Sequence, residues 1–236
     1  MKRLTFRLAV LAVIVIFIQN LIFINKADGF VSWTDPNGSA DSFYWANGGS
    51  DFGLFGNPNI SENTFSFSPS EFLATSLDGL PADVCDILTF DLIAKPGFSI
   101  TEIHVSEGGL YDILIDGLVN VTQECKIENL LTHETKFGIL NFTPSMPITS
   151  GTDTWTITAT ISGFNWTHLR LFLYNDLYAQ SDYVALVDKK AAGTPLITII
   201  PEPATIAMLL IGSLAFIPKK MTITKYIHKK GDVRME

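Results

Sequence analysis

Asp153-Thr154-Trp155-Thr156-Ile157-Thr158-Ala159-Thr160-Ile161 is the stretch of sequence that decides the fold. Apolar side chains occupy every second position from Trp155 to Ile161, and threonines occupy the positions between them. Successive side chains of a β-strand point to opposite faces of a sheet, so this period of two predicts a strand with one buried and one exposed face.

The rest of the middle of the chain repeats this pattern. Short segments rich in β-branched and aromatic residues are separated by turn-forming pairs such as Pro96-Gly97 and Asp116-Gly117. The segments are 87–93, 98–105, 136–142 and 169–174. Because no long apolar stripe of helical period lies between them, we expect residues 28–199 to form one all-β domain. We expect an antiparallel β-sandwich of jelly-roll or immunoglobulin-like type.

Charge is distributed unevenly along the chain. The whole chain carries 16 Lys and Arg against 24 Asp and Glu, a net charge of −8. Residues 28–200 contain six basic and 21 acidic residues, and the other ten basic residues flank the apolar runs at the two ends. This is the positive-inside pattern of a chain whose middle is exported. Nucleic acid is an unfavourable partner for such an acidic domain, because phosphate contacts need basic side chains.

The N-terminal end has the organisation of a secretory signal. Basic residues precede an apolar run from Leu8 to Ile24, and we expect residues 1–27 to be a signal peptide that is cleaved after Ala27. Asn25 is not the small residue usual at that cleavage site, so an uncleaved signal anchor is the alternative.

The C-terminal end has three parts in order: Pro201-Glu202-Pro203-Ala204-Thr205, an apolar run to Ile217, and the basic pair Lys219 and Lys220. Proline lacks an N–H and fixes φ, so we expect the triplet to continue neither helix nor sheet and to be accessible to a protease. As a helix the apolar run is about 21 Å long, shorter than the ~30 Å hydrocarbon core of a bilayer. We therefore expect a temporary membrane helix with the lysines as a cytoplasmic stop, followed by a basic cytoplasmic tail at 221–236.

This order of parts resembles the PEP-CTERM sorting signal of exported bacterial proteins, here at residues 200–220. Two stretches of the middle, 88–109 and 169–182, are similar to the bodies of small planctomycete-type proteins that carry this signal. The resemblance implies an exosortase-type processing enzyme as a partner and delivery to the cell envelope or extracellular matrix. It also implies association with exopolysaccharide or biofilm. Family members usually end close to the basic cluster, whereas this chain continues to Glu236.

Three groups of residues are candidates for sites in the exported part. An oxidising compartment favours a disulfide between Cys85 and Cys125, with two separate buried thiols as the alternative. Acidic loops rich in Gly and Asn supply oxygen ligands for calcium, although solvated turns are the alternative. The calcium candidates are Asp35, Asn37, Asp41 and Asp51. Tyr44 and Trp45 are candidates for stacking on a sugar ring, with ordinary core packing as the alternative.

Nothing in the sequence indicates a specific catalytic mechanism. The motifs of serine hydrolases, zinc proteases, P-loop enzymes and dinucleotide-binding enzymes are absent. Carboxylate pairs such as Glu102 with Glu107, or Asp112 with Asp116, are expected by number alone in an acidic domain. We therefore expect a non-catalytic envelope or matrix protein that needs no cofactor. A carbohydrate-binding module or a carbohydrate-active enzyme is the alternative, and an enzyme requires a cleft lined by carboxylates with perturbed pKa values.

Overall fold

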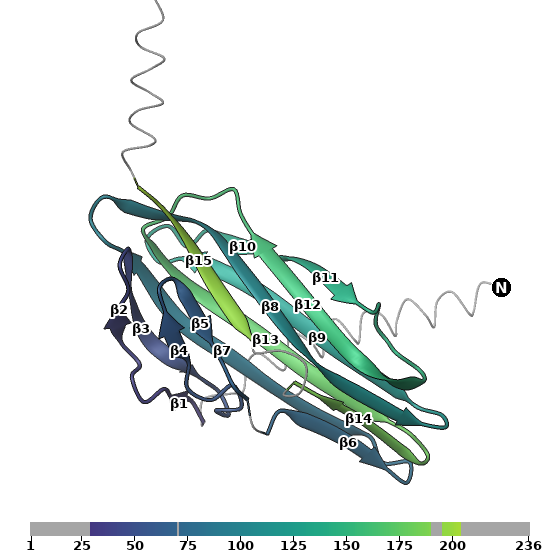
Figure 1. Cartoon of the computed structure of the whole chain (residues 1–236). Coiled ribbons are helices and arrows are strands. Elements are labelled where there is room, and N and C mark those ends of the chain that lie inside the picture. The colour runs from purple at the N-terminus through teal and green to yellow at the C-terminus, as the bar shows by residue number, and fades with distance from the viewer. Residues whose placement is uncertain (1–28, 70, 190–194, 204–236) are drawn as a thin grey trace, which may run out of the picture.

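The computed structural model describes residues 29–69, 71–189 and 195–203, and all regular structure in these ranges is β-strand (Figure 1). Sheet A contains β1 (Val31–Ser32), β2 (Gly38–Ser39), β3 (Phe43–Ser50), β7 (Ala82–Ala94), β9 (Leu118–Asn129), β10 (Thr135–Phe137) and β13 (His168–Gln180). Its order is β1-β3-β7-β13-β9-β10, and β2 also pairs with β3.

Sheet B contains β4 (Asn59–Ser61), β5 (Thr64–Ser66), β6 (Leu73–Leu77), β8 (Phe98–Leu114), β11 (Ile139–Thr143), β12 (Gly151–Ile161), β14 (Val184–Asp188) and β15 (Leu196–Pro203). Its order is β11-β12-β8-β15-β5-β4, and β14 pairs with both β8 and β6. Every strand pair in both sheets is antiparallel.

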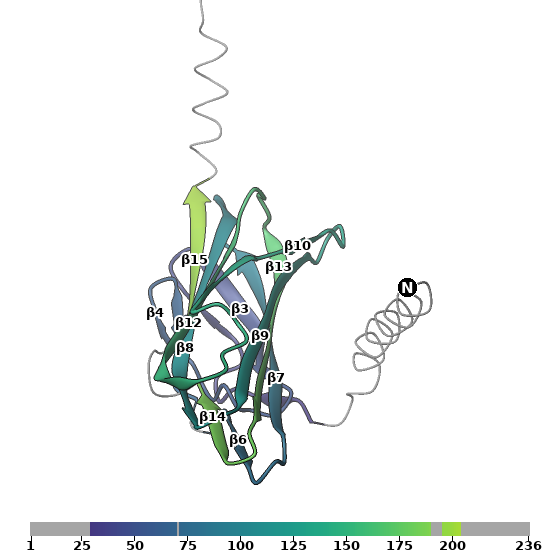
Figure 2. The ribbon, with the colours of Figure 1, turned by 90° about the vertical axis from the view of Figure 1, so that its right-hand side faces the viewer.

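The two sheets form two layers around one core. Figure 2 shows β7, β9 and β13 in one layer and β8, β12 and β15 in the other. The prediction of an all-β fold built from two antiparallel sheets is confirmed. All four predicted strand segments lie in strands, and the segment 136–142 is divided between β10 and β11 at Gly138.

The core follows the alternation that the sequence predicts. Trp155 and Ile157 on β12 are fully buried and Ile161 is 1 % exposed, whereas the threonines between them face outward. A group of aromatic rings belongs to the same core. The ring of Trp33 lies 5.3 to 6.0 Å from the rings of Phe65, Phe67 and Phe90, a spacing typical of favourable aromatic packing.

The last strand corrects one sequence-based expectation. Pro201, Glu202 and Pro203 belong to β15 and pair with β8 after a register shift at Ile200/Pro201, so the triplet does continue a sheet and the domain extends past residue 199. β5 pairs with β15 only as far as Thr198, so no described strand lies along the far side of the triplet. The missing N–H groups of the two prolines are therefore tolerated there, as on an edge strand.

The other predictions for the two ends fall outside the described residues. These are the signal peptide at 1–27, the apolar helix from Ala204 to Ile217 with Thr205, the basic stop at Lys219 and Lys220, and the tail at 221–236. Within the described ranges, no helix has the length and apolar character that crossing a membrane requires.

Candidate functional site

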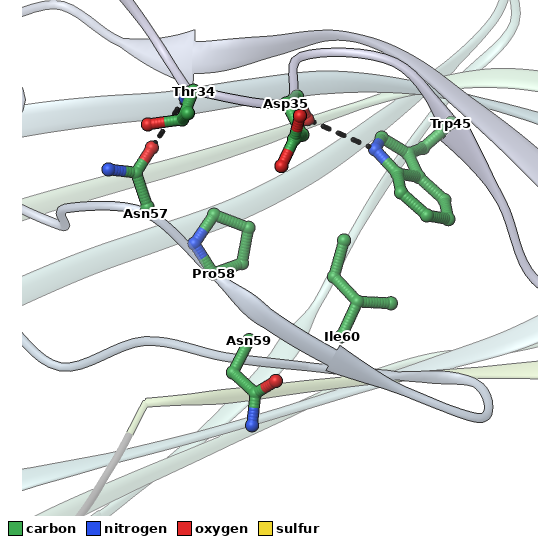
Figure 3. Close-up of a pocket in the computed structure, with 7 residues that line it drawn as sticks. All are labelled: Thr34, Asp35, Trp45, Asn57, Pro58, Asn59 and Ile60. Atoms are coloured by element: carbon green, nitrogen blue, oxygen red, sulfur yellow. Dashed lines mark hydrogen bonds between the residues drawn. The ribbon is translucent and has the colours of Figure 1, made fainter.

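A surface pocket of about 300 Å³ lies between the segment that follows β1 and the approach to β4 (Figure 3). Its volume is at the lower end of the range for small-molecule sites. Two hydrogen bonds connect its walls: Thr34 N donates to Asn57 Oδ1 over 2.6 Å, and Trp45 Nε1 donates to the Asp35 carbonyl over 3.4 Å. The lining residues are Thr34, Asp35, Trp45, Asn57, Pro58, Asn59 and Ile60.

Trp45 is the aromatic wall of this pocket. Its indole is partly buried and packs edge-on against Phe65, with 5.8 Å between ring centroids. Gly38 lies directly against the indole, and a Cβ at that position would overlap the ring. The glycine thus lets the β2 backbone lie against the ring, and together with Phe65 it holds Trp45 in one orientation.

Tyr44 does not share this pocket. It neighbours Trp45 on β3, so its side chain points to the opposite face, where it is 45 % exposed and Lys95 Nζ lies 5.0 Å from its ring centroid. The structure therefore places the two stacking candidates on opposite faces of β3, and Trp45 is the one that lines this pocket.

The calcium candidates occupy separate turns. Asp41 precedes β3 and Asp51 follows it, so an eight-residue strand separates them, a length of roughly 25 Å. Asn37 Oδ1 accepts a hydrogen bond from Asn47 N over 3.1 Å, the kind of contact that shapes a turn, and Asp35 lines the pocket. Among the described residues, no cluster of three or more His, Cys, Asp or Glu side chains is arranged to hold a metal ion.

The two cysteines are not bonded to each other. Cys85 on β7 and Cys125 on β9 are separated by β13, where they face Asp176 and Leu173 respectively. Two strand spacings are roughly 9–10 Å, more than the ~7 Å that a disulfide permits between Cα atoms. Cys125 points into the core, and burial, with smaller contributions from Glu107 and Glu124, raises the pKa of its thiol to about 12.

The outer face of sheet A carries a carboxylate pair that the sequence analysis did not single out. Burial, followed by a hydrogen bond and repulsion from Asp83, raises the pKa of Asp176 to about 7. Tyr174 lies on the same face, and its pKa is raised chiefly by burial and then by Asp176. Two carboxyl groups that hydrogen-bond to each other lie closer together than the ~5 Å at which glycosidase carboxylates flank a sugar.

The carboxylate pair Glu102 with Glu107 does not converge on a substrate-accessible surface. Glu102 points outward and forms an ion pair with His104, whereas Glu107 is fully buried between the sheets. There its carboxylate lies 2.8 Å from Nζ of Lys189, which is also completely buried. Asp112 instead accepts a hydrogen bond from Thr152 over 2.5 Å.

The sequence analysis did not predict that Glu107 and Lys189 meet in the core, although the buried position of Glu107 was predictable. Glu107 occupies the same strand face as Ile103 and Val105, so the period of two on β8 already placed a carboxylate in the core.

Comparisons with models of known protein families and with curated proteins found no match to this chain. The class of the protein is therefore defined by its fold alone: an acidic all-β domain of two antiparallel sheets.

Proposed function

We propose that the chain is an exported, non-catalytic protein of the cell envelope or extracellular matrix that binds carbohydrate through the Trp45 pocket. The observation that carries the proposal is the placement of an immobilised indole beside amide and carboxylate side chains in one hollow. The proposed scaffold is a β-sandwich of jelly-roll or immunoglobulin-like type, delivered by the signals at its two ends. The exosortase-type processing enzyme and extracellular polysaccharide are its proposed partners.

The pocket has the two kinds of group that sugar recognition uses. The face of an indole packs against the C–H groups of a pyranose ring, and amides and carboxylates exchange hydrogen bonds with its hydroxyl groups. Asn59 and Asp35 are exposed at the pocket and supply such groups, whereas Asn57 Oδ1 is already engaged by the Thr34 backbone. The volume fits one or two sugar units rather than a long chain segment.

Titration of the protein with defined oligosaccharides tests this proposal. The panel contains cello-, chito-, xylo- and manno-oligosaccharides and the soluble exopolysaccharide of the source cells, and binding is followed calorimetrically. We expect saturable binding to at least one, weakened about tenfold or more by Trp45→Ala and several-fold by Asn59→Ala. Because Trp45 also packs on Phe65, thermal unfolding of each variant accompanies the titration.

Tyr44→Ala is the matched control. It removes an aromatic side chain from the adjacent position on the same strand but from the other face, so it leaves binding unchanged. Absence of binding across the panel, or equal losses in Trp45→Ala and Tyr44→Ala, contradicts the proposed function.

A carbohydrate-active enzyme is the second candidate, with Asp176 acting alone as the proton-transfer group, since Asp83 lies too close to it to be the second carboxylate of a glycosidase. A carboxyl group with a pKa of about 7 is suited to proton transfer at neutral pH. The test is the release of reducing ends from the same oligosaccharides. Activity that Asp176→Asn abolishes supports the enzyme, and its absence leaves the binding protein as the proposal.

A further inference from the structure

The interior between the sheets contains a buried lysine in an apolar setting. Lys189 directly follows β14, and its side chain is completely buried. Its Nζ lies 4.3 Å from the ring centroid of Phe55 and 4.9 Å from that of Phe72. Glu107 Oε1 lies 2.8 Å from Nζ and forms an ion pair with it, and among the described residues no other acceptor is hydrogen-bonded to Nζ.

Three polar side chains of sheet A face this lysine and glutamate. Asp86, Asn175 and Gln123 lie in one row across β7, β13 and β9, directly opposite each other in the strand register. Asn175 Nδ2 donates to Glu107 Oε1 over 3.5 Å, and Gln123 Nε2 donates to Glu107 Oε2 over 2.9 Å. The side-chain oxygens of Asn175 and Gln123 are buried without a hydrogen bond. Such orphaned oxygens are rare in native interiors because each is costly.

Asn175 and Lys189 approach the same oxygen atom of Glu107. Their two nitrogens are therefore no farther apart than 6.3 Å, the sum of the two distances to Oε1. Asp86 is differently engaged, because its carboxylate accepts hydrogen bonds from Ser50 Oγ and from the backbone N–H groups of Phe52, Leu54 and Ile87. Asp86 thus holds the segment after β3 in place. In contrast, Oδ1 of the Asn175 carboxamide has no hydrogen-bond partner and lies near the amine of Lys189.

We propose that Lys189 and Asn175 form an intramolecular isopeptide bond, with Glu107 as the acid–base group, so that β13 of sheet A is covalently tied to the end of β14 in sheet B. Nζ of Lys189 attacks Cγ of Asn175, the Cγ–Nδ2 bond breaks, and ammonia leaves. The product is a secondary amide. The reaction exchanges one amide for another and needs no oxidant, metal or water.

The surroundings supply the required protonation states. Burial lowers the pKa of Lys189 to about 8 against the opposing attraction of Glu107, and burial raises the pKa of Glu107. Proton transfer from the ammonium to the carboxylate therefore gives a nucleophilic amine and a neutral acid, and it removes the charge from both groups. The acid then donates its proton to Oδ1 of Asn175, which lacks a partner until that step. This polarises the carbonyl for attack.

The protons balance at the end of the sequence. Counted from the ion pair, Nζ of Lys189 gives up two protons to Glu107, one before and one after the attack. Glu107 passes one proton to Nδ2 as ammonia departs, and Oδ1 returns its proton to Glu107 when the carbonyl re-forms. Glu107 finishes neutral and hydrogen-bonded to the new amide, so neither Glu107 nor Lys189 carries a charge after the reaction. This proposal does not depend on carbohydrate binding, because none of its residues lines the Trp45 pocket.

Peptide mass mapping of the purified full-length chain is the test. Trypsin cleaves after Arg170 and after Lys190, but not after Lys189 once its amine is acylated, and Asp-N cleaves before Asp176 and before Asp188. We expect a branched product in which Leu171–Asn175 is joined to Asp188–Lys190, lighter by about 17 Da than the two peptides together, the mass of ammonia. Recovery of Leu171–Asn175 and Asp188–Lys189 as separate unmodified peptides overturns the proposal.

Variants test the role of each residue. Glu107→Gln removes the acid and abolishes the link, whereas Glu102→Gln, which changes an outward-facing carboxylate on the same strand, leaves it complete. If Glu107→Gln does not fold, Glu107→Asp retains the acid but retracts it, and the linked fraction falls. Full linkage in a folded Glu107→Gln variant overturns the role of Glu107. A link from Lys189 to the peptide that contains Gln123, or to Asp86 with loss of water, overturns the assignment to Asn175.

Discussion

The indole N–H of Trp155 donates a hydrogen bond to the backbone carbonyl of Asp188 over 2.9 Å and so fixes the residue that precedes Lys189. Two further contacts hold the same point: Leu110 N donates to Asp188 Oδ1 over 3.1 Å, and Lys189 N donates to the Phe72 carbonyl over 3.0 Å. The end of β14 is thereby fastened to β8, β12 and the segment before β6. This framework directs the Lys189 side chain inward.

Gly109→Ala is expected to disturb that framework. Gly109 pairs with Trp155 in the β8–β12 register, and a Cβ at this position would overlap the carbonyl oxygen of Asp188. The obstacle is backbone, which cannot move aside as a flexible side chain does. We expect a loss of about 2–3 kcal/mol in the free energy of unfolding, measured by urea titration.

Ser106→Ala is the control for this prediction. It lies on the exposed face of the same strand and should change the stability by less than about 0.5 kcal/mol. A Gly109→Ala variant as stable as the control would show that Asp188 relaxes freely, and the account of a fixed β14 end would be wrong.

The strands were predictable because their pattern is local. In β12 the alternation of threonine with apolar residues predicts both the strand and its buried face, and the structure confirms both. The strand order was not predictable, since it depends on pairings such as β13 with β7 and β9, which are far apart in sequence. The Pro-Glu-Pro triplet illustrates the limit: proline chemistry argues against a strand, but the absent neighbour on one side removes the penalty.

The cluster of Glu107, Asn175 and Lys189 shows which side-chain positions the sequence could predict and which it could not. Asn175 interrupts the buried series Leu171, Leu173, Leu177 on β13, so its inward direction was readable from the period of two. Lys189, next to Lys190 and a turn, has the sequence context of a surface residue. That these two meet Glu107 depends on the register and spacing of two sheets, which no local pattern encodes.

The cysteines should differ sharply in reactivity. The thiol of Cys125 is 1 % exposed and its pKa is raised to about 12, so almost no thiolate is present at neutral pH, whereas Cys85 is only partly buried on the outer side of sheet A. In the native protein we expect iodoacetamide to modify Cys85 well before Cys125, and to modify both after unfolding. Peptide mapping locates each label. Equal native labelling, or a Cys85–Cys125 disulfide in the non-reduced map, contradicts the strand arrangement.

Asp176 should make the protein less stable as the pH rises. Its folded pKa of about 7 lies above the unfolded value near 4, so between these values the folded state holds a proton that the unfolded state has lost. The contribution is complete below pH ~4 and disappears as the pH rises through about 7. The groups that face it are Asp83 and Cys85 on β7 and Tyr174 on β13.

Asp176→Asn removes this dependence. Because the side chain is only partly buried, we expect a gain of about 1 kcal/mol or less at pH 8 after solvent screening is taken into account, and no gain at pH 5. Thermal unfolding of the wild type and the variant at both values measures it. Asp153→Asn, an exposed carboxylate on β12, serves as the control and should show no such difference. A variant equally stable or less stable at pH 8 would contradict the raised pKa of Asp176.

The C-terminal signal gives the last prediction. Pro201 and Pro203 end β15, where β8 pairs with them on one side and Glu202 and Pro203 are exposed. The proposed exosortase-type enzyme would therefore meet the triplet at an open strand edge. In a host that has such an enzyme, a tag fused after Glu236 should be lost from the delivered wild-type protein and retained when Pro201→Ala is combined with Pro203→Ala. Immunoblotting of the cell envelope and medium follows the tag. Pro218→Ala, a proline outside the triplet, is the control and should still lose it. A tag that persists on delivered wild-type protein, or delivery that the double substitution leaves unchanged, would make the segment an anchor rather than a sorting signal.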